Sequence, residues 1–272
     1  MSKTIFITGA SKGFGRIWTE ALLKRGDKVV ATARTLSLLE DLKTTYGENV
    51  HTIQLDVTDR DAVFAAAQEA KDHFGKIDVV INNAGFGLFG AVEETTEQQA
   101  RDQFEPNFFG LLWVTQAFIP VMREQGGGHI IQISSILGVV TFPTLGLYNA
   151  SKFAVEGLTE SLAPEVAQFG IKLTLLEPNA YQTDWIGAHA VHTEANPLYN
   201  KVKEDLYASF GDDFFGKPEA TADLVLKVVD SENPPLRIFV GKQCYPFAKA
   251  VYEQKWAVWD EWAQTANEAH GV

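Results

Sequence analysis

Residues 3–183 alternate between short apolar runs and longer segments in which apolar residues recur every three or four positions. Short apolar runs bounded by polar residues or glycine are typical of buried strands, and the longer periodic segments are typical of amphipathic helices. The runs are apolar throughout rather than at alternate residues, so both faces of each strand should be covered. The pattern therefore predicts an α/β fold, with a parallel sheet between two layers of helices.

The predicted elements follow one another along the chain. We expect strands at 4–8, 28–33, 50–55, 77–81, 129–133 and 172–176, and helices at 16–25, 37–46, 60–74, 97–124 and 149–169. Pro106 should break the fourth helix, since a proline inside a helix removes a hydrogen bond. Residues 1–272 contain no glycine- or proline-rich linker of domain-separating length, which predicts a single domain. Within it, 184–216 is expected to form a substrate lid and 244–272 a C-terminal helical extension.

Composition excludes several classes of function. The chain of 272 residues is 46% hydrophobic and has a formal net charge of −12. An acidic surface disfavours a nucleic-acid or anionic-membrane partner. Cys244 is the only cysteine, so no intrachain disulfide forms and a reducing compartment is expected. The N-terminal apolar run is too short for a signal peptide, and no stretch approaches the ~20 residues of a membrane span. We expect a cytoplasmic protein.

The candidate catalytic residues lie between His129 and Lys152. An apolar run leads into Ser135, and Tyr148 precedes Lys152 by four residues at the start of a helical pattern. Residues at i and i+4 lie on one face of a helix. An ammonium beside a phenol favours the phenolate and should lower the tyrosine pKa from its ordinary value of about 10. The segment predicts an acid/base pair with a serine beside it.

The same Tyr-x-x-x-Lys spacing occurs at two other places, Tyr199/Lys203 and Tyr245/Lys249. Ser135 lies thirteen positions before Tyr148, whereas Ile186 and Glu232 hold the matching positions for the other pairs. Only the first pair also has an apolar strand leading into its serine. The sequence therefore favours catalysis at Tyr148 and Lys152 alone, against the alternative of two surface residues on a helix.

A glycine-rich turn follows the first predicted strand. Gly9, Gly13 and Gly15 separate that strand from the first helix, where a dinucleotide pyrophosphate rests in open α/β sheets. Glycine lets the backbone turn sharply and approach phosphates closely. The spacing differs from the common Gly-x-Gly-x-x-Gly, and no Gly-Lys-Ser/Thr follows, which excludes a P-loop. The turn favours nucleotide binding, with a simple tight connection as the alternative.

Together these motifs resemble the short-chain dehydrogenase/reductase family in its one-domain branch. The resemblance rests on Thr8-Gly-Ala-Ser-Lys-Gly-Phe-Gly15, Asn82-Asn-Ala-Gly85, Asn107, Ser135 and Tyr148-x-x-x-Lys152. It implies a Rossmann-like, doubly wound fold with a seven-stranded parallel sheet and helices on both faces. It also implies hydride transfer between a nicotinamide and a carbonyl or alcohol carbon. The sequence looks nearest to hydroxysteroid-dehydrogenase-like and ketoreductase members.

The resemblance implies four catalytic roles. Tyr148 would protonate the carbonyl oxygen as hydride arrives, and Ser135 would hold that oxygen. Lys152 would lower the pKa of Tyr148 and bond the nicotinamide ribose, while Asn107 would hold a proton-relay water. Two hydroxyl donors aimed at an oxygen that gains negative charge stabilise the transition state.

The resemblance also implies a set of cofactor contacts. These are Gly9, Ser11, Lys12, Gly13, Phe14, Gly15, Arg34, Asp56, Val57, Asn83, Ala84, Gly85, Tyr148, Lys152, Pro178, Asn179 and Thr183. Asp56 and Val57 would contact the adenine ring, although an aspartate that caps the next helix would look the same. Thr183 would bond the nicotinamide carboxamide. The Asn82–Gly85 stretch also suits an ordinary turn at a strand end.

Cofactor choice depends on the end of the second strand. NAD-dependent relatives carry an acid there to bind both ribose hydroxyls, but this chain has Ala33 followed by Arg34, with Lys12 in the glycine turn. Two cations without an acid suit a 2′-phosphate, which arginine can bind through two hydrogen bonds. The expectation is NADP(H), and the alternative is that both cations are merely solvated.

Two positions depart from the family pattern. Asn179 stands where the family usually has glycine, and Pro106 precedes Asn107 where an apolar residue is usual. Asparagine tolerates a left-handed backbone, and we expect its side chain to project towards the nicotinamide or the substrate.

The last third of the chain is expected to recognise the substrate. Segment 184–216 is rich in apolar and aromatic residues, namely Trp185, Ile186, Leu198, Tyr199, Leu206, Tyr207, Phe210, Phe214 and Phe215. His189 and His192 lack a third ligand at a diagnostic spacing, so no metal site is expected. A helical stripe follows at Tyr252, Trp256, Trp259 and Trp262. It suggests core or subunit packing, with pocket lining as the alternative.

The sequence thus predicts an NADPH-dependent carbonyl reductase, reversible as an alcohol dehydrogenase, for an apolar ketone, aldehyde or secondary alcohol. The resemblance implies a homodimer or homotetramer built on helices 97–124 and 149–169. Two alternatives remain, an epimerase or dehydratase of the longer family branch and an NADP(H)-binding sensor. The sensor would not need Asn107, Ser135, Tyr148 and Lys152 together.

Overall fold

A seven-stranded parallel sheet forms the centre of the computed structural model, which describes residues 2–183, 185, 190–211 and 213–271. The strands are β1 (Thr4–Ile7), β2 (Lys28–Ala33), β3 (Val50–Gln54), β4 (Val79–Asn82), β6 (Gly128–Ile133), β7 (Ile171–Pro178) and β9 (Arg237–Val240). They lie in the order β3-β2-β1-β4-β6-β7-β9, and every pairing is parallel. The predicted α/β fold with a seven-stranded parallel sheet is confirmed.

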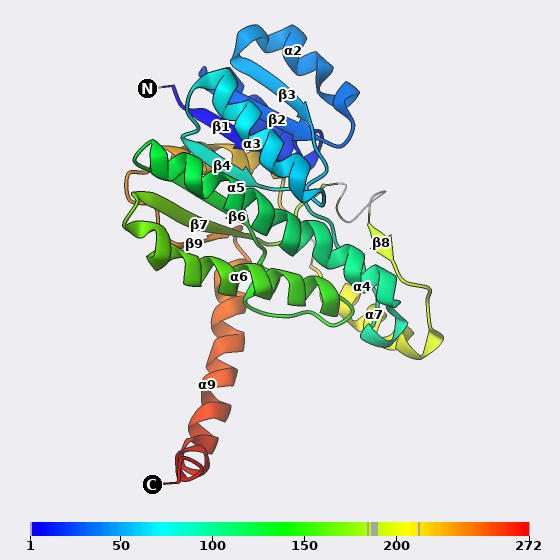
Figure 1. Cartoon of the computed structure of the whole chain (residues 1–272). Coiled ribbons are helices and arrows are strands. Elements are labelled where there is room, and N and C mark those ends of the chain that lie inside the picture. Colours follow the sequence, from blue (N-terminus) through cyan, green and yellow to red (C-terminus); the bar gives the residue numbers. More distant parts are fainter. Residues whose placement is uncertain (1, 184, 186–189, 212, 272) are drawn as a thin grey trace.

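Helices cover both faces of the sheet (Figure 1). They include α1 (Gly13–Arg25), α2 (Glu40–Tyr46), α3 (Arg60–Phe74), α4 (Glu97–Phe104), α5 (Leu111–Glu124), α6 (Gly146–Ala167), α7 (Asn200–Ala208), α8 (Ala222–Asp230) and α9 (Cys244–Glu268). Successive strand residues point to opposite faces, so Ile5 and Ile7 pack with α1 and α8, while Phe6 packs with α3 and α5. All three are fully buried. This explains why the strands are apolar throughout.

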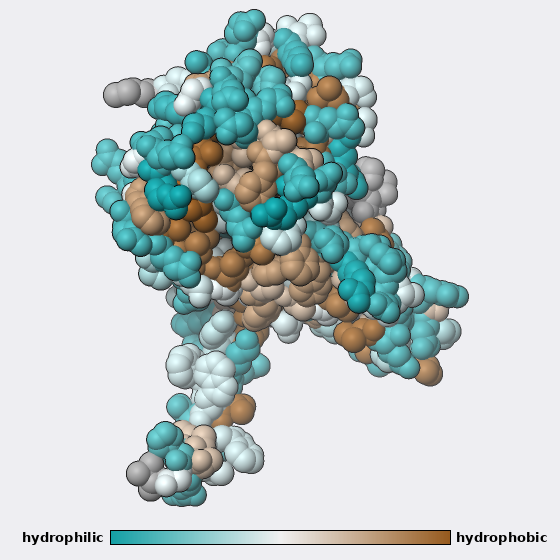
Figure 2. Space-filling model, viewed as in Figure 1, coloured by the Kyte–Doolittle hydropathy of each residue, from teal (hydrophilic) through white to brown (hydrophobic). Residues whose placement is uncertain are grey.

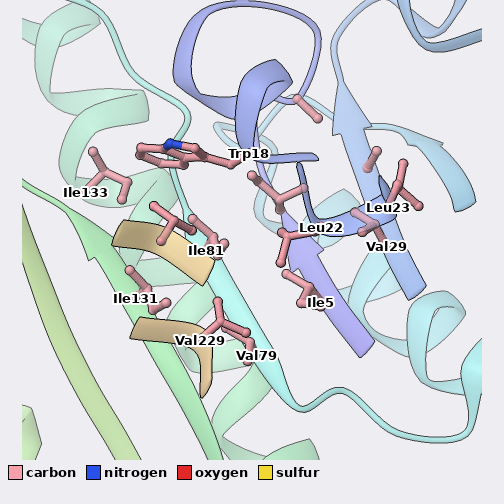
Figure 3. Close-up of a cluster of buried hydrophobic side chains, with 14 of the residues drawn as sticks. Ile5, Trp18, Leu22, Leu23, Val29, Val79, Ile81, Ile131, Ile133 and Val229 are labelled. Atoms are coloured by element: carbon pink, nitrogen blue, oxygen red, sulfur yellow. The ribbon is translucent and has the colours of Figure 1, made fainter. Parts of the chain in front are cut away.

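Trp18 anchors the face covered by α1 and α8. Figure 3 shows its indole above Ile81 and beside Ile133, two residues of the central strands. The indole Nε1 donates a 2.8 Å hydrogen bond to Thr221 Oγ1, so the one polar atom of the ring is satisfied inside the core. Packing here fixes α1, and with it the glycine turn at its start.

The long helix predicted over 97–124 is interrupted. α4 ends at Phe104, a π-helical turn η4 (Glu105–Gly110) follows, and α5 begins at Leu111. Pro106 lies at the start of η4, where a missing backbone donor costs less than in a helix interior. The wider turn places Asn107 inward, with 1% of its surface exposed. The predicted break at Pro106 occurs.

The C-terminal helix α9 extends away from the rest of the molecule (Figure 1). Cys244 and Ala248 in its first two turns are buried, but the tryptophans of its later turns are 51–61% exposed. These are the predicted stripe residues Trp256, Trp259 and Trp262, together with the 36%-exposed Tyr252. The expectations of core packing and of pocket lining are therefore wrong for this stripe, because the helix leaves the body before reaching it.

Several elements were not expected from the sequence. These are strand β9, helix α8, and a small two-stranded sheet of β5 (Leu88–Phe89) with β8 (Val191–His192). β9 completes the sheet next to β7 through the register Leu175–Arg237 to Pro178–Val240. No helix in the described part of the chain is long and apolar enough to cross a membrane.

Candidate active site

Ser135, Tyr148 and Lys152 meet at the carboxyl end of β6. Ser135 follows that strand, and its Oγ accepts a 3.1 Å hydrogen bond from Leu137 N and lies near the Tyr148 hydroxyl. Tyr148 lies in the first turn of α6, and the Lys152 Nζ is 5.8 Å from the centre of its ring. Lys152 Nζ donates a 2.8 Å hydrogen bond to Ile133 O. The strand end and the helix thus bring together three residues predicted from spacing.

Burial controls the proton affinities of this group. Tyr148 and Lys152 are each 6% exposed. Burial raises the pKa of Tyr148 to about 12, which the Ser135 hydroxyl partly opposes, and lowers the pKa of Lys152 to about 8. The expected lowering of the Tyr148 pKa by Lys152 is not found, because burial disfavours the charged phenolate. At neutral pH the phenol is protonated and the lysine is charged.

Asn107 connects η4 to two neighbouring segments. Its Oδ1 accepts from Phe86 N at 3.0 Å, and its Nδ2 donates to Phe86 O at 2.9 Å and to Ser151 Oγ at 3.2 Å. Phe86 follows β4, and Ser151 precedes Lys152 in α6. The side chain therefore fixes the loop after β4 against the catalytic helix, and its expected hold on a relay water stays a prediction.

The glycine turn forms a tight cradle before α1. Gly9 and Gly13 have φ of 69° and 53°, the left-handed region that favours glycine. A Cβ on Gly15 would lie 2.2 Å from Gly9 O and 2.6 Å from Asn83 Nδ2. Ser11 and Phe14 are half-buried in the same turn. Only a chain without side chains at these points can fold so closely.

The stretch after β4 stabilises this cradle. Thr8 Oγ1 accepts hydrogen bonds from Asn83 N and Ala84 N, both at 3.0 Å, and Asn83 Nδ2 donates to Thr8 O at 2.9 Å. A Cβ on Gly85 would lie 2.8 Å from Asn107 Oδ1. These contacts join the glycine turn to Asn107, so the asparagine–glycine stretch is more than a simple turn. Thr8 belongs to the family motif, but the sequence does not indicate its role in holding the stretch after β4.

The start of α1 suits an anion. Its first turn contains no acidic residue, and no side chain caps its N-terminus, which leaves backbone N–H groups and the positive end of the helix dipole available. Arg34 and Lys12 are exposed beside it. Among the described residues, no hydrogen bond or ion pair engages the Arg34 guanidinium. The cradle and these cations fit the phosphates of a dinucleotide.

Asp56 and Val57 follow β3. Asp56 Oδ1 accepts from Thr58 N at 3.0 Å and from Thr58 Oγ1 at 2.9 Å. The helix cap of α3 is Asp59, whose Oδ1 accepts from Ala62 N at 3.0 Å. The alternative that Asp56 caps the next helix is therefore wrong. Its carboxylate is exposed beside the buried Val57.

The segment after β7 differs from expectation at Asn179. Thr144 is the only described non-glycine residue with positive φ, so the backbone of Asn179 is not left-handed. Its Nδ2 donates to Phe214 O at 3.2 Å, and its Oδ1 lies in the space that a Cβ on Gly241 would fill. The side chain points to the segment around Phe214 rather than projecting freely into the site. Pro178 O accepts from Ser135 Oγ at 3.4 Å.

Aromatic side chains close the site on the substrate side. The Trp185 ring lies 4.9 Å from the Tyr148 ring and 5.1 Å from the Phe89 ring. Trp185 N donates to Thr183 Oγ1 at 3.4 Å. A second cluster comprises Phe142, Phe210, Phe214 and Phe247. Phe142 and Phe247 also pack in the apolar cluster that contains Tyr148.

Part of the predicted lid lies outside the described residues, namely Asp184, Ile186–His189 and Asp212. His189 is among them, whereas His192 is exposed and stacks on Phe89. Within the described residues, no group of three or more metal-ligating side chains is placed to hold a metal ion.

Comparisons with known proteins agree with this geometry. The family model described as short chain dehydrogenase matches residues 3–192. Oxidoreductase BOA17 of Botryotinia fuckeliana is 40% identical over 97% of this chain and 98% of its own. The 3-ketodihydrosphingosine reductase of Bacteroides thetaiotaomicron is 37% identical over 87% of both chains.

Solved structures are similar over nearly the whole chain. A short-chain dehydrogenase from Streptomyces avermitilis has a TM-score of 0.90 and 38% identity, covering 98% of both chains. One from Burkholderia phymatum, in complex with NAD, has a TM-score of 0.78 and 27% identity over 93% of both. One from Burkholderia cenocepacia, in complex with NADP, has a TM-score of 0.72 and 27% identity over 96% of this chain and 97% of that one. The chain belongs to the short-chain dehydrogenase family and is an oxidoreductase of that family.

Proposed function

We propose that the protein is an NADPH-dependent carbonyl reductase, reversible as an alcohol dehydrogenase. The observation that carries the proposal is the buried Tyr148, protonated at neutral pH, with Ser135 near its hydroxyl and the charged Lys152 beside it. A general acid must hold its proton until the substrate oxygen becomes basic. The raised pKa of Tyr148 meets that requirement for reduction.

The residues that would hold the cofactor surround this group. The glycine cradle and the start of α1 would bind the pyrophosphate, while Asp56, Val57 and the stretch Asn83–Gly85 would lie along the adenosine. Pro178, Asn179 and Thr183 would line the nicotinamide end. A bound nicotinamide supplies the hydride. The close approach of Gly15 to Gly9 O and Asn83 Nδ2 supports this fit.

Two hydroxyl donors would then act on the substrate oxygen. Ser135 Oγ donates a hydrogen bond that orients the carbonyl, and Tyr148 transfers its phenolic proton as negative charge develops on that oxygen. The Lys152 ammonium stabilises the resulting phenolate, which is costly to form in a buried place. Asn107 holds the loop after β4 against α6. A water bound at Asn107 would return the proton from solvent.

The pKa values set the direction of the pH dependence. Lys152 loses its charge as pH rises through about 8, and the phenolate then loses its nearby cation. Reduction should therefore be fastest below pH 8 and decline above it.

The substrate we propose is an apolar ketone, aldehyde or secondary alcohol. Trp185, Phe142 and Phe214 present aromatic surface on the side of the site where Tyr148 lies. Apolar and aromatic lining favours apolar ligands, with a few polar groups for orientation. One relative is named as the reductase of a keto compound, which supports the same class.

Preference for NADPH over NADH rests on Arg34. Its guanidinium is exposed at the end of β2, and Ala33 stands where an acid would bind the ribose hydroxyls of NAD. A 2′-phosphate would supply the anion that Arg34 lacks among its described neighbours.

We further propose a single domain in which the described parts of 184–216 act as a lid, and assembly into a dimer or tetramer through α5 and α6. Figure 2 shows apolar surface across these two helices, and Phe109 and Phe153 are 37% and 38% exposed. Apolar side chains gathered on one face are typical of a subunit interface.

A spectrophotometric assay tests the proposed function. The purified protein should oxidise NADPH in the presence of a panel of apolar ketones and aldehydes, with NADH run in parallel. Turnover with at least one carbonyl and a preference for NADPH would support it. Tight NADPH binding without turnover on any member would instead favour the NADP(H)-binding sensor.

A further inference from the structure

Two buried carboxyl groups lie behind the site, and the proposed reaction does not use them. Glu156 is one helical turn after Lys152 on α6, and Glu177 immediately precedes Pro178 at the end of β7. Their side chains are 7% and 1% exposed. Carboxylates are rarely so buried unless paired, because the charged form loses its hydration.

The positive charge near them is insufficient for two carboxylates. Arg237 Nε of β9 lies 3.0 Å from Glu156 Oε2 and 3.6 Å from Glu177 Oε1. The same guanidinium also binds the exposed Glu160 through a 2.8 Å contact. One cation shared among three acids leaves the buried pair with an excess of negative charge if both ionise.

The other groups near the pair are neutral, except Lys152, whose ammonium is hydrogen-bonded elsewhere. Ser134, after β6, has a buried hydroxyl without a hydrogen-bond partner among the described residues. On α9, Cys244 Sγ lies 3.3 Å from Glu177 O, and burial raises the pKa of this thiol to about 12. Lys152, one turn away on α6, gives a hydrogen bond to Ile133 O. None of these supplies a second cation to Glu177.

The two carboxyl groups also lack donors. No N–H or O–H of the described residues lies within hydrogen-bonding distance of Glu156 Oε1 or of either Glu177 oxygen. Arg237 Nε lies 3.0 Å from an oxygen of one carboxyl group and 3.6 Å from an oxygen of the other, so the two groups are neighbours. An ionised carboxylate only accepts hydrogen bonds, so a hydrogen bond can form between them only when one of the two is protonated.

We propose that Glu156 and Glu177 share one proton beneath Ser135 and Lys152, and that the single negative charge of this pair keeps the buried lysine cationic. Glu156 is then a positioning residue that acts through Lys152, so this second part rests on the proposed function. The charge of Glu156 raises the pKa of Lys152 against the effect of burial. Burial, and then the charge of Glu156, raises the pKa of Glu177 to about 8.

Stability against pH tests the shared proton without any assay of activity. Glu177 has a folded pKa above its ordinary 4.5, so folding takes up a proton between those values, and its contribution to stability falls as pH rises from 4.5 to 8. Glu177→Gln cannot ionise and loses this dependence. The Tm of the variant minus that of the wild type should increase by a few degrees from pH 5 to 8.

Glu160→Gln is the matched control, because it removes an exposed carboxylate from the same arginine. Its Tm difference from the wild type should stay constant over this range. A Glu177→Gln difference that is equally constant would overturn the shared proton, whether or not the protein reduces any carbonyl.

The pH profile of reduction tests the effect on Lys152. Glu156→Gln combined with Glu177→Gln removes the negative charge of the pair, so the decline of kcat/KM at alkaline pH should move about one unit lower. Glu160→Gln should leave its position unchanged. A purely structural role for Glu156 would lower the whole profile without moving it, and that result would overturn the second part of the proposal. Absence of wild-type turnover would instead count against the proposed function.

Discussion

Helices α6 and α9 carry the same Tyr-x-x-x-Lys spacing in opposite surroundings. Tyr148 on α6 is 6% exposed and lies near Ser135, whereas Tyr245 on α9 is 65% exposed. Lys152 is buried, whereas Lys249 is 59% exposed and lies 3.8 Å from Glu253. Helical spacing makes both pairs neighbours, but α6 buries its pair at the end of β6, whereas α9 leaves its pair on the surface. Burial, more than spacing, gives the first pair its unusual proton affinities.

The largest effect on kcat should come from removing the hydroxyl of each tyrosine in turn. Tyr148→Phe removes the general acid and should reduce kcat by about 10³-fold, whereas Tyr245→Phe should leave it within about twofold. Steady-state NADPH oxidation on a ketone measures both. Similar losses in the two variants would show that burial does not distinguish the pairs.

Removing the ammonium group of each lysine should give the same contrast between the two pairs, with a smaller effect on kcat. Lys152→Met keeps much of the side-chain volume but removes the cation that stabilises the phenolate, so kcat should fall about 10²-fold. Lys249→Met removes an exposed ion pair that contributes little and should leave both kcat and Tm nearly unchanged. An unaltered kcat in Lys152→Met would remove the lysine from the mechanism.

Arg34 tests whether an exposed side chain can also be functional here. Arg34→Ala should raise the KM for NADPH by about tenfold, since a hydrogen bond to a charged group contributes about 1.5–3 kcal/mol. The KM for NADH should stay the same, because NADH has no 2′-phosphate. Equal changes in the KM for NADPH and for NADH would mean that Arg34 does not bind the 2′-phosphate.

Asn179, which is only half-buried, should give the smallest effect. Asn179→Gly removes the hydrogen bond to Phe214 O and increases the freedom of the unfolded chain, which together cost about 1 kcal/mol. Thermal unfolding should show a Tm lower by about 2–4 °C. A higher Tm would mean that the buried, unpartnered Oδ1 of Asn179 destabilises the native chain.

Local patterns were enough to predict the sheet and the strand-end motifs. Strands β1, β2, β3, β4, β6 and β7 could be predicted as apolar runs because both their faces are covered. The glycine turn, Ser135 and Tyr148 were recognisable because backbone geometry and helical spacing fix them within short segments. The break at Pro106 follows from the chemistry of proline alone.

Features that depend on distant parts of the chain were missed. Arg237 lies on the edge strand β9, and its contact with Glu156 joins residues that are 81 positions apart, so this contact could not be read from the sequence. The raised pKa of Tyr148 depends on its burial, to which Trp185 from the segment after β7 contributes. The conformation of Asn179 depends on the carbonyl of Phe214, which lies far along the chain.

The most direct measurement follows the hydrogen itself. NADPH carrying deuterium at the transferable position of its nicotinamide should be incubated with a reducible ketone and the protein, and the alcohol analysed by mass spectrometry. The proposed function predicts one deuterium on the carbinol carbon with the wild type and almost no product with Tyr148→Phe. An alcohol without deuterium, or deuterated product formed equally well by Tyr148→Phe, would contradict it.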